Sequence, residues 1–174
     1  MILTCGRGQE LARVANSMAI LGWKLPLMGG ESLSSVAYMD GASANGDGAM
    51  MPQTFLQTGN TERRARFIAA YRFADRVIRM PSPDAAAQGY DSLLLLKAAI
   101  EQAKSTEGPA IREALENLGT KVEGVVTIYD HPFSPTDHEA ITASIPVIGV
   151  VRGRHVVPAH EEDFSGGRVI RLKK

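Results

Sequence analysis

The pattern of apolar and polar positions predicts a βαβ unit at the start of the chain. Residues 2–5 and 25–28 are short apolar runs, and residues 9–21 between them place an apolar side chain every three or four positions. This spacing is typical of the buried stripe of an amphipathic helix, and the flanking runs are typical of short strands. Strands joined through a helix run parallel, so both are expected to end at the same edge of one sheet.

The same reading extends the α/β pattern along the chain. A short helix capped by Ser32 or Ser34 and a strand within residues 49–56 follow the opening unit. Periodic apolar positions then predict three longer helices, over residues 62–77, 84–103 and 106–118. Ser82-Pro83-Asp84 is a typical helix start, and the apolar stretch around residues 93–99 predicts a helix buried on most sides. Gly89 inside that helix suggests close packing or an approach of the backbone to a ligand.

After residue 118 the alternation of helices and strands ends. Residues 122–129 are predicted to form a strand, and residues 145–151 and 154–158 a hairpin that turns on Gly153. The tail from His160 is expected either to add an edge strand or to remain loose.

The helix over residues 62–77 is unusual in its charge. Its expected apolar face contains Phe67, Ala70, Tyr71, Ala74 and Ile78, and arginines stand at positions 63, 64, 66, 72, 76 and 79. The simplest interpretation is that these arginines form the solvated face of the helix. Binding of an anion is the alternative.

Composition excludes several classes of function. The chain has 174 residues, is 44% hydrophobic and 22% charged, and balances 19 Lys and Arg against 19 Asp and Glu. With this balance the chain has no excess of basic residues of the kind that binds nucleic acid. The longest apolar run is too short to span a bilayer. Cys5, the single cysteine, cannot form an internal disulfide. The N-terminus has no signal-peptide pattern, and a strand from the second residue suggests that the chain begins within a fold.

Arg7 and Glu31 are the candidate functional residues, because they follow the two predicted strands of the opening unit. Open α/β sheets bind ligands at this edge. Gly6-Arg7-Gly8 with Glu31 after the next strand resembles a dinucleotide fingerprint, but Leu11 replaces its third glycine. A binding site without chemistry is also possible, in which Glu31 takes a ligand cation and Arg7 offers a planar fork or a stacking surface.

Two further chemistries involve other residues of the chain. Ser32 in Gly30-Glu31-Ser32-Leu33-Ser34 could be the nucleophile of a serine hydrolase, although Ser34 replaces the second glycine of the elbow and helix capping is the simpler role. Asp91 or Asp137 with His138, His155 or His160 would complete the triad. The acidic residues and histidines of positions 130–139 lack helical metal-ligand spacing, so no metal or cofactor is expected.

Several segments together resemble one known family. They are Gly8-Gln9-Glu10-Leu11-Ala12-Arg13, Leu21-Gly22-Trp23-Lys24-Leu25-Pro26-Leu27-Met28-Gly29, Met51-Pro52-Gln53-Thr54-Phe55, Ala87-Gln88-Gly89-Tyr90-Asp91 and Ile111-Arg112-Glu113-Ala114-Leu115-Glu116. In this order they resemble the C-terminal half of periplasmic solute-binding proteins of ABC transporters, of the leucine/isoleucine/valine-binding family. The resemblance covers residues 1 to about 159.

The resemblance implies parts of two Rossmann-like lobes of a type I periplasmic binding protein, without the N-terminal half. Residues 1–55 would be the remainder of the C-terminal lobe, 56–143 a section of the N-terminal lobe, 144–159 return strands and 160–174 a tail. The full-length parent would be periplasmic, work with an ABC permease and not be an enzyme. A ligand-sensing regulator of the same fold is the alternative.

The resemblance also implies roles for the two candidate residues. Glu31 stands where amino-acid binders of the family receive the ligand's ammonium group. Arg7 stands where an aromatic side chain commonly covers the ligand, which favours a ligand with a carboxylate or an aromatic ring as much as an aliphatic one. The expected ligand is therefore an amino acid or a related small carboxylate. Without the other half, helices 9–21 and 84–103 are expected to leave apolar faces uncovered, so that the chain self-associates, exchanges segments or is poorly stable. Light scattering and calorimetry would test this.

Overall fold

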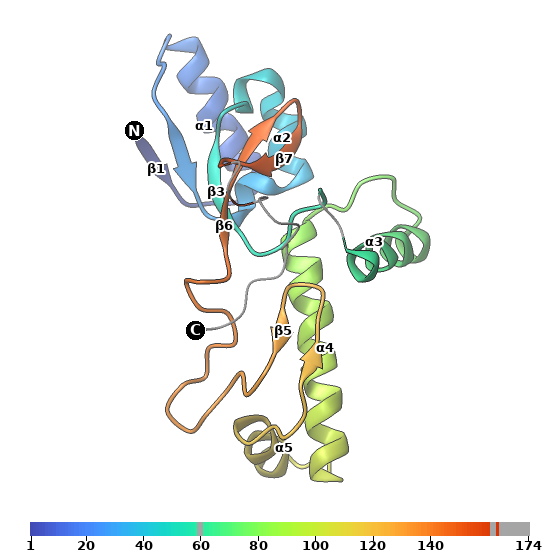
Figure 1. The fold of residues 1–174 in the computed structure, drawn as a ribbon. Coiled ribbons are helices and arrows are strands. Elements are labelled where there is room, and N and C mark those ends of the chain that lie inside the picture. The colour runs from blue at the N-terminus through green and yellow to red at the C-terminus, as the bar shows by residue number, and fades with distance from the viewer. Residues whose placement is uncertain (59–60, 161–162, 164–174) are drawn as a thin grey trace. The chain divides into compact units, whose positions relative to one another are not determined.

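The computed structural model describes residues 1–58, 61–160 and 163, and divides them into two compact units. One unit contains residues 1–85 and the described residues from 147 onward, and the other contains residues 86–146 (Figure 1). The expected tail beyond residue 163 lies outside the described residues. No helix in the described part of the chain is both long and apolar enough to cross a membrane.

A five-stranded sheet forms the centre of the first unit, in the order β1-β2-β3-β6-β7. Its strands are β1 (Ile2–Thr4), β2 (Leu27–Gly29), β3 (Met50–Gln53), β6 (Val147–Arg152) and β7 (His155–Pro158). The first three strands are parallel, as the opening βαβ pattern predicts, and the antiparallel β6–β7 hairpin continues the sheet from β3. The predicted turn on Gly153 is confirmed, with φ of 55° at that residue.

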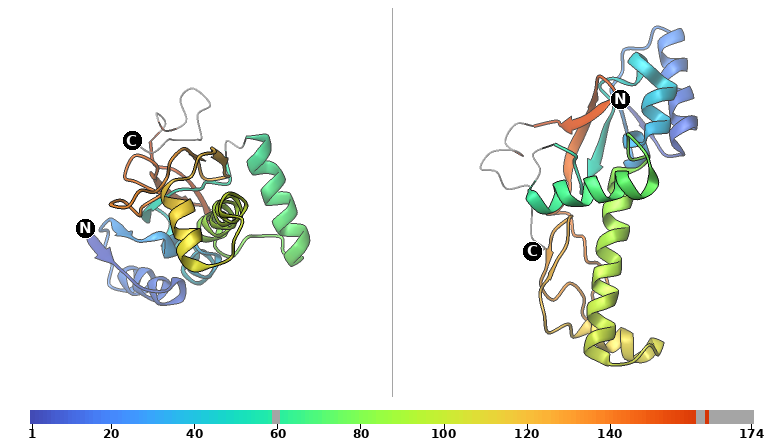
Figure 2. Two further views of the ribbon diagram at one scale, coloured as in Figure 1. Left: turned by 90° about the horizontal axis from the view of Figure 1, so that it is seen from below. Right: turned by 90° about the vertical axis from the view of Figure 1, so that its right-hand side faces the viewer.

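Helices α1 (Gly8–Ile20) and α2 (Val36–Ala42) cover one face of this sheet, as the right-hand view of Figure 2 shows. The stripe of α1 is buried in the core, with Leu11 and Ala15 only 2% and 3% exposed. The expectation that this helix leaves its apolar face uncovered is therefore wrong, because α2 packs on it. Gly8 permits the contact, since a Cβ there would lie 2.2 Å from Ser35 Oγ and 3.0 Å from Tyr38 N.

The short helix after β2 starts later than predicted. Residues Glu31–Ser34 form a 3-10 turn, η1, and α2 begins only after Ser35. The Ser35 hydroxyl accepts a hydrogen bond from Tyr38 N–H at 3.2 Å, so Ser35 is the cap in place of Ser32 or Ser34. A second 3-10 turn, η2 (Ser43–Gly46), leads to β3.

Helix α3 (Glu62–Asp75) begins at the predicted residue, and the Thr61 side chain before it accepts Arg64 N–H. Its buried face differs from the expected one, because it contains Arg64 and Ile68 beside Phe67. The Arg64 guanidinium lies over the Phe55 ring, 5.0 Å from its centroid. This cation–π contact stabilises the buried charge. Ile78, predicted to be inward, lies beyond the helix and is exposed.

Helix α4 (Pro83–Ala103) starts as predicted but is less buried than expected. Leu95 and Ala99 are buried, whereas Leu93 is 66% exposed and Leu96 is also exposed. The apolar stretch therefore has one covered side, and the prediction of burial on most sides is wrong. The predicted self-association now rests on this helix and not on α1.

The second unit packs α4 against α5 (Gly108–Glu116) and a hairpin of β4 (Val122–Glu123) and β5 (Ile128–Tyr129). Leu95, Leu118, Val122 and Tyr129 form its core. The single strand predicted over residues 122–129 is thus two short antiparallel strands. The reason is Asp91, whose buried carboxylate accepts the N–H groups of Val125 and Val126 at 2.7 and 2.8 Å and holds the chain in a turn.

Gly89 gives a stability prediction, because no close packing explains this glycine. A Cβ at this helical position would have no neighbour within 4 Å. Gly89→Ala is therefore expected to raise the free energy of unfolding by about 0.5–1 kcal/mol, since alanine loses less backbone entropy in a helix. Chemical denaturation checks it, and a lower midpoint would contradict the open environment of this position.

Candidate functional site at the strand ends

Arg7 and Glu31 lie in the loops that follow β1 and β2, at one edge of the sheet. β1 and β2 pair in parallel with Thr4 opposite Gly29, so that both strands end at this edge. β3 runs in the same direction and ends nearby at Gln53. The predicted placement of these two loops is confirmed, while the roles of Arg7 and Glu31 remain predictions.

The loop that carries Glu31 is held close to β1. A Cβ at Gly29 would lie 2.6 Å from the Thr4 carbonyl oxygen, so the two strands approach here more closely than any other residue allows. Glu31 then opens η1, and its carbonyl oxygen accepts the Ser34 hydroxyl at 2.7 Å. The backbone that presents the Glu31 carboxyl is thus fixed on both sides.

Asp84 is a third residue at this edge. The sequence did not identify it as a residue of the site. Its Oδ1 accepts hydrogen bonds from Thr54 N–H at 2.8 Å, Thr54 Oγ1 at 2.7 Å and Phe55 N–H at 2.7 Å. These bonds join the loop after β3 to the first turn of α4. The sequence indicated only an acid in a first helical turn, because nothing in it pairs Asp84 with a loop about 30 positions earlier.

The Glu31 carboxyl adjoins this buried aspartate. Burial raises the pKa of Glu31, and the hydrogen bond and the negative charge of Asp84 raise it further. Three donors already converge on Asp84 Oδ1, and the Glu31 carboxyl lies beside this aspartate. A ligand cation placed here would favour the ionised form of Glu31.

The raised pKa has a consequence for stability. A carboxyl with a higher pKa in the folded state binds more protons than in the unfolded state, so its contribution falls as pH rises from the ordinary carboxyl range through the raised pKa. The free energy of unfolding of the wild type, minus that of Glu31→Gln, is expected to fall in this window. Denaturation across a pH series measures it, and a difference that rises with pH would contradict the Glu31–Asp84 pair.

Arg7 occupies the residue before α1. Its backbone N–H donates to Glu10 Oε2 at 3.0 Å, which closes the first turn of the helix with a carboxylate. The residue is exposed, and among the described residues its guanidinium has no hydrogen-bond or ion-pair partner. The side chain is therefore available to a ligand at this edge.

The dinucleotide hypothesis gains no support from the glycine loop. Gly8 serves the contact between α1 and α2, and the Glu10 carboxylate already occupies the N-terminal turn where a pyrophosphate would lie. The described residues also contain no group of three or more His, Cys, Asp or Glu arranged to hold a metal ion.

The side chains of three residues of the hydrolase hypothesis have other partners. His155 Nδ1 lies 2.9 Å from the Gly153 carbonyl oxygen, His138 Nε2 lies 3.2 Å from Glu116 Oε1, and Asp91 holds the turn at residues 125–127. Ser32 accepts the Ser35 hydroxyl on its carbonyl oxygen at 2.7 Å. Within the described residues, no hydrogen bond links Ser32 to a histidine base.

Comparisons with known proteins agree with this geometry. Residues 1–152 match the model of a family described as periplasmic binding protein. Among solved structures, a type 1 periplasmic binding protein from Bordetella pertussis has 25% identity and a TM-score of 0.73, and the alignment covers 90% of this chain and 45% of that one. No curated protein sequence matches the chain.

Two further structures show the same fold at lower identity. The leucine binding protein LivK of Thermotoga maritima has 19% identity and a TM-score of 0.74, with 91% of this chain and 43% of that one covered. The substrate binding protein LivJ of Streptococcus pneumoniae has 22% identity and a TM-score of 0.68, with 90% and 44% covered. The chain thus spans less than half the length of these structures. It belongs to the periplasmic binding protein family and has the α/β fold of its type I members.

Proposed function

We propose that this chain is part of the solute-binding component of an ABC transporter and binds its ligand without breaking a bond. The full-length parent would be a periplasmic protein that closes two lobes on a small molecule and delivers it to a permease. Family membership supports this proposal, and so do the related structures, among them the LivJ protein in complex with isoleucine and a Thermus thermophilus transporter protein with bound valine.

The observation that carries the proposal is the acidic pair at the strand ends. Glu31 adjoins Asp84, and the two carboxyls together create a site that favours a cation. The exposed guanidinium of Arg7 follows the neighbouring strand and suits a carboxylate or an aromatic ring. A molecule with an ammonium group and an acid or aromatic group would be recognised at both places. We therefore propose an amino acid, or a related small carboxylate, as the ligand.

Calorimetric titration with a panel of amino acids tests the proposal. Aliphatic, aromatic and acidic amino acids would each be compared with the analogue that lacks the amino group. We expect at least one amino acid to bind and its des-amino analogue to bind more weakly, because only the ammonium group contacts Glu31. If no member of the panel binds, or the analogues bind equally well, the ligand class is wrong.

A further inference from the structure

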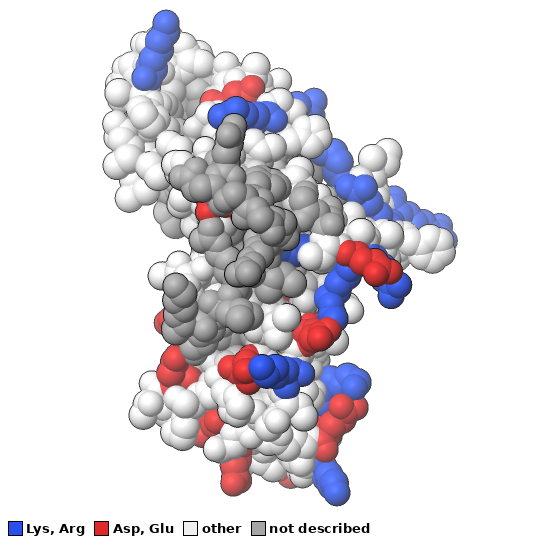
Figure 3. All heavy atoms as spheres, viewed as in Figure 1, with Lys and Arg blue, Asp and Glu red and all other residues white. Residues whose placement is uncertain are grey.

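A cavity in the first unit has four basic side chains and no acidic side chain in its wall. Its volume is about 230 Å³, and its lining includes Arg72 from α3, Arg79 from the segment before α4, and Arg154 and His155 from the β6–β7 hairpin. Thr58 adds a hydroxyl, while Arg7 and Glu31 do not line it. Figure 3 shows Lys and Arg side chains gathered along the side of this unit that carries α3.

The three arginines are held in different ways. Arg79 Nη1 lies 2.7 Å from Asp40 Oδ1, and Arg154 Nη2 contacts the same oxygen. Arg72 contacts only a neutral acceptor, Gln57 Oε1, at 3.3 Å. One carboxylate thus faces two guanidinium groups, and the third has no carboxylate partner among the described residues. The wall keeps a net positive charge of about two.

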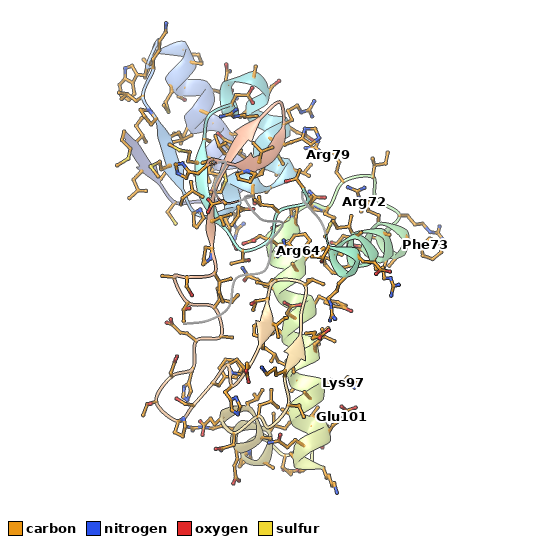
Figure 4. The ribbon with its side chains drawn as sticks, viewed as in Figure 1. Arg64, Arg72, Phe73, Arg79, Lys97 and Glu101 are labelled. Atoms are coloured by element: carbon orange, nitrogen blue, oxygen red, sulfur yellow. The ribbon has the colours of Figure 1, made fainter. Side chains whose placement is uncertain are left out.

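The backbone brings these residues together at some cost. Arg154 has φ of 64° in the turn of the hairpin and Arg76 has φ of 52° at the end of α3, where glycine is usually favoured. The first turn places Arg154 beside Asp40, and the second redirects the chain from α3 toward Arg79. Figure 4 shows Arg72 and Arg79 on this side of the unit. Arg154 lines the cavity, and Arg76 lies in the chain between Arg72 and Arg79, which also line it.

We propose that this cavity binds a small oxyanion with two negative charges, at a site whose lining does not include Arg7 or Glu31. Guanidinium forks match the paired oxygens of a carboxylate or a phosphate, and two uncompensated charges favour a dianion over a monoanion. A volume of about 230 Å³ admits a molecule of a few heavy atoms, such as phosphate or a short dicarboxylate. Arg72 and Arg79 thereby acquire the anion-binding role that the charge pattern left open.

Titration of the protein with inorganic phosphate, succinate and acetate at low ionic strength tests this site. We expect phosphate or succinate to bind with a Kd below about 10 mM and acetate to bind at least about tenfold more weakly. Phosphate binding alone would identify a phosphate-like ligand, and succinate binding alone a dicarboxylate. Absence of binding by both dianions, or equal binding of acetate, would overturn the proposal.

Matched arginine variants locate the site. Arg72→Ala removes an exposed side chain without a carboxylate partner and is expected to weaken dianion binding about tenfold or more, with the circular dichroism spectrum unchanged. Arg66→Ala is the control, because Arg66 lies on the same helix but pairs with Glu62 and does not line the cavity. Glu31→Gln should retain the dianion affinity. Equal losses in Arg72→Ala and Arg66→Ala would show non-specific attraction and overturn the site.

Discussion

Asp91→Ala is expected to lower the free energy of unfolding by about 3–5 kcal/mol, the largest effect of any single substitution considered for the second unit. Asp91 is almost fully buried, and its carboxylate accepts Val125 N–H at 2.7 Å, Val126 N–H at 2.8 Å and the Tyr129 hydroxyl at 2.9 Å. Truncation would remove the carboxylate that these buried donors share. Chemical denaturation followed by circular dichroism measures the loss.

Two further variants test whether the loss of stability comes from the Asp91 carboxylate. Asp137→Ala, at an exposed position of the same unit, is expected to change the free energy of unfolding by less than about 1 kcal/mol. Asp91→Asn keeps one acceptor oxygen but turns an amide N–H₂ toward the donors, so an intermediate loss is expected. If Asp91→Ala is as mild as Asp137→Ala, the carboxylate does not hold the turn between β4 and β5.

The Asp91 variants also differ in their response to pH. Burial raises the pKa of Asp91, against the opposing effect of its hydrogen-bond donors. The folded state therefore holds this proton more tightly than the unfolded state, and the contribution of Asp91 to stability falls as pH rises through the raised pKa. Asp91→Asn is expected to remove that part of the pH dependence.

Glu31→Gln is expected to weaken amino-acid binding by about 10- to 100-fold. The amide keeps the size of the side chain but loses the negative charge that would face the ligand ammonium group. Asp84 remains and retains part of the attraction, so binding is weakened rather than abolished. Calorimetric titration with the best ligand of the panel gives the ratio of the two Kd values.

Glu62→Gln is the matched control for this substitution. Glu62 is an exposed glutamate in the same unit, paired with Arg66 on the first turns of α3. Its substitution is expected to leave the Kd unchanged, which would show that the loss in Glu31→Gln is local and not an effect of net charge. Equal affinity of wild type and Glu31→Gln would remove Glu31 from the binding site.

Local patterns in the sequence predicted the opening half of the first unit well. The apolar spacing of residues 9–21 and the short runs on either side correspond to α1, β1 and β2, and Gly153 marks the hairpin turn. These features depend on residues close together in the chain. The position of the Arg7 and Glu31 loops at one edge followed from the same local pattern and the parallel direction of joined strands.

Contacts between distant residues account for the features that were missed. Asp84 reaches Thr54 and Phe55, and Asp91 reaches residues 125–129, across about 30 positions or more in each case. No periodicity encodes such a pairing. The pattern predicts a solvated Arg64, because arginine side chains are usually exposed. The Arg64 guanidinium is instead buried over the ring of Phe55, which belongs to a different segment.

The loops after β1 and β2 are proposed to bind the ligand. Backbone amide shifts in a two-dimensional NMR titration with the best amino-acid ligand test this proposal most directly. The largest changes are predicted at residues 6–8 and 30–32, with smaller ones at Thr54 and Phe55, which hydrogen-bond to Asp84. If those amides stay unchanged while the signals of residues elsewhere shift, the ligand binds at another site and the proposed role of the strand ends is wrong.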